Sequence, residues 1–458
     1  MEQNIRALEK QLNDFDAGAR AEALTGLLDL VNQGAIELPP TNDVANMHCH
    51  TFFSYNGYGY SPTALAWLAR REGYKLMGIV DFDVLDGVDE FLVAADRVAV
   101  RPSTGMETRA FMPEFADREI NSPGEPGVTY HMGIGFTSSH VPEEESETGS
   151  LSGAAGILAD MRERAADRNR DQVSRINDYL GVVAIDYQRD VLPLTPSGNA
   201  TERHICAAYV RAAAQRTTDP VAFWSKKLNA PREKVAAIID DGPAIQNLVR
   251  SGLMKAGSVG YVKPGPATFP SVEEVNQVIV ACGALPCITW LDGTSEGEQA
   301  AEELFGLMIE KGGVALNIVP DRNWNISDPQ EKQIKLQHLY DVVNLALELD
   351  LPINVGTEMN AFGKPLIDDF SAPELAPVRD TFLDGAYFIY GHTALARSLD
   401  LGYQSAWAKG HLPTRADRNR FYTQAGRLIL PGIAGRAVLK GMAAEPEPDV
   451  ILARLREQ

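Results

Sequence analysis

The hexapeptide Asn46-Met47-His48-Cys49-His50-Thr51 lies where the sequence changes from a helical to a strand-like pattern. Side chains on an extended segment alternate between two faces, so His48 and His50 point to the same side. Imidazole is a common ligand of transition-metal ions in proteins. If the strand ends here, both rings can reach one ion, and the stretch predicts a metal site at a strand end. The alternative is two unrelated polar residues at the end of a strand.

Three further apolar runs also carry a ligand-type residue. They are Ile79-Val80-Asp81-Phe82-Asp83, Thr104-Gly105-Met106-Glu107 and Tyr130-His131-Met132. Because α/β folds place their chemistry at the carboxyl ends of strands, Asp81, Glu107 and His131 are candidate site residues. Each has a structural alternative: the aspartates as turn or helix caps, Glu107 as a solvated side chain and His131 as a core histidine.

Short apolar runs alternate with helical stretches over most of the chain. The expected strands are 45–48, 75–81, 98–104, 127–136, 284–289, 313–319, 352–356 and 386–390. The expected helices between them include 62–72, 88–98, 271–282, 297–311 and 331–348. This alternation predicts an α/β fold with a mostly parallel sheet or barrel. Residues 140–265 interrupt it with a mainly helical segment.

Composition and charge exclude several classes of protein. The 458 residues are 45% hydrophobic and 23% charged, which is ordinary for a globular protein and excludes wholesale disorder. The net charge of −20 opposes binding to polymeric nucleic acid or an anionic membrane. No apolar run is long enough to span a membrane, and the polar, acidic start does not read as a secretory signal. A cytoplasmic location is therefore expected.

The order of these motifs resembles the PHP (polymerase and histidinol phosphatase) superfamily. The similar features are the His-x-His pair, an aspartate on the second strand, Gly-x-Glu on the third and an isolated histidine on the fourth. Within the helical segment, Thr201-Glu202-Arg203-His204-Ile205-Cys206-Ala207 resembles the insert of PHP phosphoesterases that act on nucleotides. The last family motif corresponds to Gly356-Thr357-Glu358-Met359-Asn360, and the resemblance covers roughly residues 45–365.

The resemblance implies a distorted (β/α)7-type PHP barrel with a helical insertion domain and helical N- and C-terminal extensions. The expected parts are an N-terminal extension (1–42), the first part of the barrel (43–140), the insertion (141–266), the second part of the barrel (267–405) and a C-terminal tail (406–458).

The resemblance also implies a metal site, which we expect to be reduced in this chain. His48, His50, Glu107 and Glu358 match family ligands of one divalent ion, which could be Zn²⁺, Mn²⁺ or Fe²⁺. The positions of ligands to other ions hold Asn56, Phe82, Trp290 and Asn360 instead. Phenylalanine and tryptophan cannot bind a metal, so one ion per chain is expected.

Four further residues are assigned catalytic roles on the same basis. Arg203 and His204 would hold a phosphoryl group and His131 would shuttle a proton, while Asp81 is a candidate metal or base residue from its place at the carboxyl end of a strand. The alternative for Arg203 and His204 is an ordinary helix start with Thr201 as its N-cap. Arg109 is a weaker phosphate-binding candidate.

Two other segments leave their roles open. His392 ends the expected strand 386–390 and could enter the site or serve the core. Residues 321–325 follow the strand 313–319 and would contact the substrate or form an ordinary structured loop.

The expected activity is that of a metal-dependent hydrolase of the PHP type, a phosphoesterase that uses a metal-activated water on a small phosphorylated metabolite or nucleotide. One alternative is a metal-dependent hydrolase, isomerase or lyase acting on a sugar-like substrate without phosphate. The other is a degenerate PHP fold that binds without turnover. The expected partner is a small anionic molecule, with no polymeric nucleic acid and no membrane, and self-association is left open.

Overall fold

Seven strands form one sheet in the computed structural model, which describes residues 1–143, 152–442 and 446–457. They are β1 (Asn42–Cys49), β2 (Tyr74–Phe82), β3 (Arg101–Phe111), β4 (Val128–Ile134), β5 (Leu285–Trp290), β6 (Ala315–Ile318) and β7 (Ile353–Val355). Neighbours in sequence are neighbours in the sheet, and a bridge between Cys49 and Glu358 joins the two edges. The expected distorted seven-stranded barrel is confirmed.

The fourth strand reverses the direction of the barrel. All other neighbouring pairs are parallel, but β4 is antiparallel to both β3 and β5. Residues directly opposite each other share a face of the sheet, so Met132 lies on the face of its partner Glu107. His131 pairs with Thr108 and therefore lies on the other face. The reversal thus decides which β4 side chains accompany Glu107.

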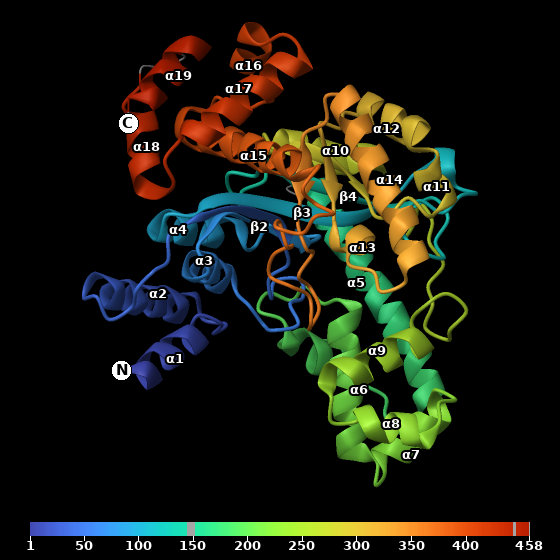
Figure 1. The fold of residues 1–458 in the computed structure, drawn as a ribbon. Helices are drawn as coiled ribbons and strands as arrows, with labels where there is room; N and C mark the ends of the chain where they lie inside the picture. Colours follow the sequence, from blue (N-terminus) through green and yellow to red (C-terminus); the bar gives the residue numbers. More distant parts are fainter. Residues whose placement is uncertain (144–151, 443–445, 458) are drawn as a thin grey trace.

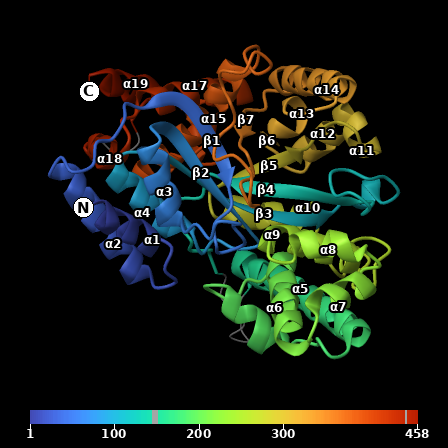
Figure 2. The ribbon, with the colours of Figure 1, turned by 60° about the horizontal axis from the view of Figure 1, so that its bottom comes forward.

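Helices flank the barrel and cover its strands (Figures 1 and 2). They are α3 (Pro62–Arg71), α4 (Val88–Val98), α10 (Val272–Ala281), α11 (Glu296–Gln299), α12 (Ala301–Glu310), α13 (Asp321–Trp324) and α14 (Pro329–Glu348). Local signals start them: Ser61 caps α3 by accepting from Ala64 N, and Ser271 forms a capping box with Glu274 on α10. With helices outside and side chains inside, the strands are buried on both faces, which explains their continuous apolar runs.

The helical segment between β4 and β5 packs around a core of its own. Its helices are α5 (Gly153–Leu180), α6 (Glu202–Arg216), α7 (Pro220–Lys227), α8 (Arg232–Ile238) and α9 (Gly242–Leu253). Helix α5 has 28 residues and joins the two cores, with Met161 in the barrel core and Ile176 in that of the segment. Figure 1 shows these helices below the sheet, opposite the C-terminal helices.

The remaining helices lie at the two ends of the chain. They are α1 (Glu2–Gln11), α2 (Ala17–Asn32), α15 (Arg379–Leu399), α16 (Ala406–His411), α17 (Arg415–Leu428), α18 (Gly432–Lys440) and α19 (Pro448–Arg456). The expected strand at 386–390 is wrong, because these residues belong to α15, which packs on β7 and α17. Among the described helices, none combines the length and hydropathy needed to cross a lipid bilayer.

Candidate functional site

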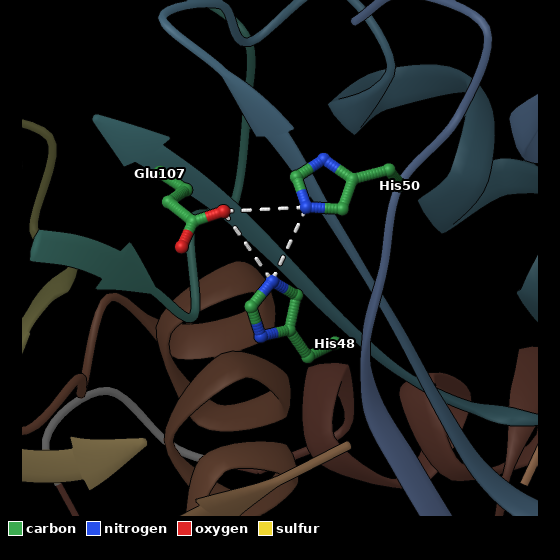
Figure 3. A group of neighbouring side chains, drawn as sticks. All are labelled: His48, His50 and Glu107. Carbon is green, nitrogen blue, oxygen red and sulfur yellow. Dashed lines mark hydrogen bonds and ion pairs between the residues drawn. The ribbon is translucent and has the colours of Figure 1, made fainter. Parts of the chain in front are cut away.

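His48, His50 and Glu107 converge inside the barrel, as their predicted role requires (Figure 3). His48 lies near the carboxyl end of β1, His50 directly follows that strand, and Glu107 comes from β3. The two Nε2 atoms are 3.4 Å apart, and Glu107 Oε2 lies 3.5 Å from that of His48 and 3.2 Å from that of His50. All three side chains are buried. The site therefore presents two imidazole nitrogens and a carboxylate oxygen to one point.

The opposite nitrogen of each ring is held by a neighbouring side chain. His48 Nδ1 lies 3.2 Å from Asn317 Oδ1, which also accepts from Asn354 Nδ2. His50 Nδ1 lies 3.1 Å from Ser54 Oγ, whose own hydroxyl donates to Asp81. Both neighbours act as acceptors here, so each ring carries a proton on Nδ1, and Nε2 is the ring atom that faces Glu107.

This donor set fits a divalent metal ion. Burial alone would raise the pKa of Glu107, but the neighbouring His48 and His50 lower it to about 2, so the carboxylate is charged at neutral pH. Glu107 Oε2 is buried and receives no hydrogen bond from any described residue. Two imidazole nitrogens and a charged, unpartnered carboxylate oxygen are a ligand set for Zn²⁺, Mn²⁺ or Fe²⁺.

The fourth predicted ligand, Glu358, lies beside this group but outside it. Its backbone pairs with Cys49, the residue between the two histidines. Its Oε2 instead accepts from Arg322 Nη2 at 2.9 Å and lies 3.7 Å from Lys364 Nζ. Gly356 brings this strand close to β1, because a Cβ there would lie 2.6 Å from His48 Cβ. The expectation that Glu358 completes the ligand set is not met in this arrangement.

Asp81 stabilises the loop that follows β1 and does not face a substrate cavity. It accepts hydrogen bonds from Thr51 N, Thr51 Oγ1 and Ser54 Oγ. Burial raises the pKa of Asp81, and these donors together with His50 oppose the rise. Its predicted role as a base is replaced by one of positioning His50 through Ser54.

The positions without family ligands are filled in ways that stabilise the site. Phe82 stacks on His50 with ring centroids 4.4 Å apart, and Trp290 is buried in the barrel core. Asn56 Nδ2 donates to His50 O and to Met359 O, which joins the loops that follow β1 and β7. Phe82 and Asn56 thus contact His50 without offering a strong metal ligand, and Trp290 fills the barrel core.

His131 lies away from the metal-ligand group, so its predicted proton-shuttling role is wrong. Its Nε2 lies 2.6 Å from Asn276 Oδ1 of α10, on the outer face of β4. Burial lowers the pKa of His131 to about 4, so the ring is neutral at pH 7. His131 is a core histidine between the sheet and a helix, with its Nε2 paired and its Nδ1 without a hydrogen-bond partner among the described residues.

A cavity of about 420 Å³ lies between the barrel and the inserted helices. Phe82 and Glu358, which adjoin the metal-ligand group, form part of its wall. Six cationic side chains line it, against three carboxylates. The cations are Arg109, Arg168, Arg203, Arg250, Arg322 and Lys364, and the carboxylates are Asp83, Glu202 and Glu358. This acidic chain thus contains a pocket in which cationic side chains outnumber carboxylates.

Arg203 and His204, the predicted phosphate-binding pair, have different surroundings on α6. Arg203 lines the pocket and donates to Asn247, with no carboxylate in ion-pair contact among the described residues. His204 points back along α6, where its Nδ1 accepts from Thr201 N to complete a capping box. The prediction for His204 is wrong, because the helix-start alternative holds for it.

Several pocket residues were not assigned from sequence. Arg168 of α5 donates to Thr268 O and lies over the Phe269 ring, with no carboxylate in ion-pair contact in the described part of the chain. Burial lowers the pKa of Arg168 to about 10, which leaves it charged. Tyr130 lines the same cavity one residue before His131. Arg168 carries no local motif that marks it, and the reversed direction of β4 hid the orientation of Tyr130.

The chain is similar to solved structures but matches no protein-family model and no curated protein. One structure is of a Bifidobacterium adolescentis protein assigned as a metal-dependent phosphoesterase, with a TM-score of 0.46 and 20% identity over 75% of this chain and 98% of that one. Another is of a Chromobacterium violaceum amidohydrolase with bound sulfate, with a TM-score of 0.45 and 16% identity over 74% and 96%. The expected seven-stranded barrel does not depend on these comparisons, because the strand order of this chain shows it.

Proposed function

We propose that this chain is a PHP-type metal-dependent hydrolase that acts as a phosphoesterase on a small phosphorylated metabolite or nucleotide. The observation that carries the proposal is the position of the group formed by His48, His50 and Glu107 behind the wall of a basic pocket. A divalent ion held by these three residues would supply the Lewis acidity that makes water nucleophilic near neutral pH.

The residues of the pocket supply binding and orientation. Arg168 and Arg203 have no carboxylate in ion-pair contact among the described residues, so the N–H groups that do not donate to Thr268 O or Asn247 can donate to phosphoryl oxygens. Arg109 pairs with Glu125 at 2.9 Å, and Arg250 pairs with Glu202 at 2.7 Å. These two arginines would therefore act on a bound anion mainly through the electrostatic potential of the pocket and less through direct hydrogen bonds. Ester hydrolysis gains rate where such donors match the charge of the transition state.

The test combines metal analysis with a panel of nucleotides and sugar phosphates. The purified protein is expected to contain one divalent ion per chain and to release phosphate from at least one compound. His48→Ala should lose both properties, because it removes one of three ligands. His140→Ala is the matched control, since His140 is exposed and outside the site.

Arg203→Ala and Arg168→Ala separate substrate binding from metal binding. Each is expected to lower kcat/KM by about 10- to 100-fold, as loss of a charge-assisted hydrogen bond does, while the metal content stays the same. Absence of a stoichiometric ion, or activity that survives His48→Ala, would refute the proposal. Bound metal without phosphate release would favour the non-phosphate alternative.

A further inference from the structure

Glu358 is a carboxylate beside the metal-ligand group that is not part of it. Its backbone adopts a left-handed conformation, with φ of +66°, which a residue other than glycine seldom adopts. This conformation places it next to Cys49. The Glu358 side chain therefore lies between two sets of neighbours. His48 and Glu107 are on one side, and the pocket cations Arg322 and Lys364 are on the other.

Arg322 holds Glu358 on the pocket side. Helix α13, which carries Arg322, follows β6 at the carboxyl end of the barrel. The Arg322 Nη2 atom donates to Glu358 Oε2, and both side chains line the pocket. Arg322 Nε is buried and has no hydrogen-bond partner among the described residues. Arg322 is therefore a cation with unused donor capacity at the boundary between pocket and metal site.

We propose that Arg322 is a positioning residue that couples oxyanion binding in the pocket to metal binding: a tetrahedral dianion pairs with Arg322 and releases Glu358 to join His48, His50 and Glu107. The inference rests on the proposed function, because it assumes a metal at this group and an anionic substrate in the pocket. It assigns to Glu358 a conditional role in place of the fixed one that the sequence predicts.

The coupling has a physical basis in competition for one carboxylate. A guanidinium that donates to an external dianion binds Glu358 less tightly, because both anions compete for the same N–H groups. Glu358 then adds a negative ligand to a group that otherwise offers one carboxylate and two neutral imidazoles. Coupling between two ligands is reciprocal, so the anion and the ion raise each other's affinity by the same factor.

The experiment measures Mn²⁺ affinity of the full chain from the free-ion electron paramagnetic resonance signal, with and without sulfate as the test dianion. Sulfate is expected to raise the affinity of the wild-type protein for Mn²⁺ about tenfold, within the usual range of coupling between sites. Arg322→Met should bind Mn²⁺ more tightly without sulfate and should lose the response to sulfate. Arg322→Lys keeps a cation in place and should restore part of that response.

A double-mutant cycle identifies the route through Glu358. Glu358→Gln should abolish the sulfate response, and the gain caused by Arg322→Met should disappear in the Glu358→Gln background. Lys332→Met is the matched control. Lys332 lies on α14, outside the pocket, and pairs with Glu374 at 2.5 Å, so its loss should change neither the Mn²⁺ affinity nor the response to sulfate.

The outcomes separate this inference from the proposed function. Mn²⁺ binding that ignores sulfate, or a sulfate response that persists in Arg322→Met or Glu358→Gln, overturns the coupling and leaves the metal site intact. A wild-type protein that binds no Mn²⁺ overturns both.

Discussion

Two hydrogen bonds decide how His48 and His50 present themselves. Asn317 Oδ1 and Ser54 Oγ accept hydrogen bonds from the Nδ1–H groups of the two rings, and the Ser54 hydroxyl in turn donates to Asp81. Partners of this kind fix the orientation of metal-binding imidazoles, and their loss commonly costs 10- to 100-fold in affinity.

Asp81→Asn is expected to lower metal affinity by about 10- to 100-fold, although Asp81 is not a ligand. The amide keeps an acceptor for Thr51 but weakens the hold on Ser54 and so on His50. A metal titration of the folded variant measures the loss. Asp43→Asn is the control, since Asp43 pairs with Lys75 away from the site. Equal metal affinity in the two variants would show that Asp81 does not support metal binding.

At the residue scale, the sequence predicted the metal-ligand group but not its surroundings. His48 and His50 follow from strand periodicity, and Glu107 from its place after a glycine at a strand end. His131 could not be placed, because β4 is buried along almost its whole length and its apolar run marks no inner face. Asn317 and Arg322 lie far from the histidines in sequence, and only the closed barrel brings them near.

At the element scale, α15 shows where an apolar pattern is ambiguous. Residues 386–390 are apolar and aromatic, which favours a strand, yet they are buried on every side within a helix of 21 residues. A short apolar run cannot by itself distinguish a strand from a buried helix. The seven barrel strands were predictable because turn signals bound each run and a helix follows most of them.

His392 on α15 makes the stability of the fold depend on pH. Its Nε2–H donates to Gly135 O and its Nδ1 accepts from Tyr403 N, and the second contact requires the neutral ring, because protonation of Nδ1 removes the acceptor. Burial lowers the pKa of His392 to about 4. The unfolded chain, with a histidine pKa near 6.5, binds the proton first, so stability present above pH ~6.5 is lost as the pH falls toward 4.

Urea unfolding of the metal-free protein in a chelator tests this dependence. Between pH 7 and 5, the free energy of unfolding of the wild-type protein should fall by about 2 kcal/mol more than that of His392→Gln, which cannot titrate. The other buried histidines titrate in both proteins and cancel in the comparison. An equal fall in the two proteins would show that His392 does not contribute.

At the scale of the whole molecule, a bound ion should hold together strands that are far apart in the chain. His48 and Glu107 come from β1 and β3 and meet only in the folded barrel. When the free-ion concentration is 100 times the dissociation constant, binding should add about 2.7 kcal/mol to the free energy of unfolding, because the unfolded chain lacks the site.

Unfolding with Mn²⁺ and with a chelator measures this difference. His48→Ala should abolish it, and His140→Ala should retain it. An increase that persists in His48→Ala would place the ion elsewhere in the molecule.

The long helix α5 connects two parts of the molecule that can vary in sequence independently of each other. The metal-ligand group comes from the barrel alone, whereas Arg168, Arg203 and Arg250 come from helices that pack around a separate core. Under the proposed function, these three anion-binding arginines are encoded in a different stretch of the gene from the metal ligands, whereas Arg109 and Arg322 of the same pocket come from the barrel segment. Variation in the inserted helices could therefore change how the pocket binds an anion while the metal-ligand group is inherited intact.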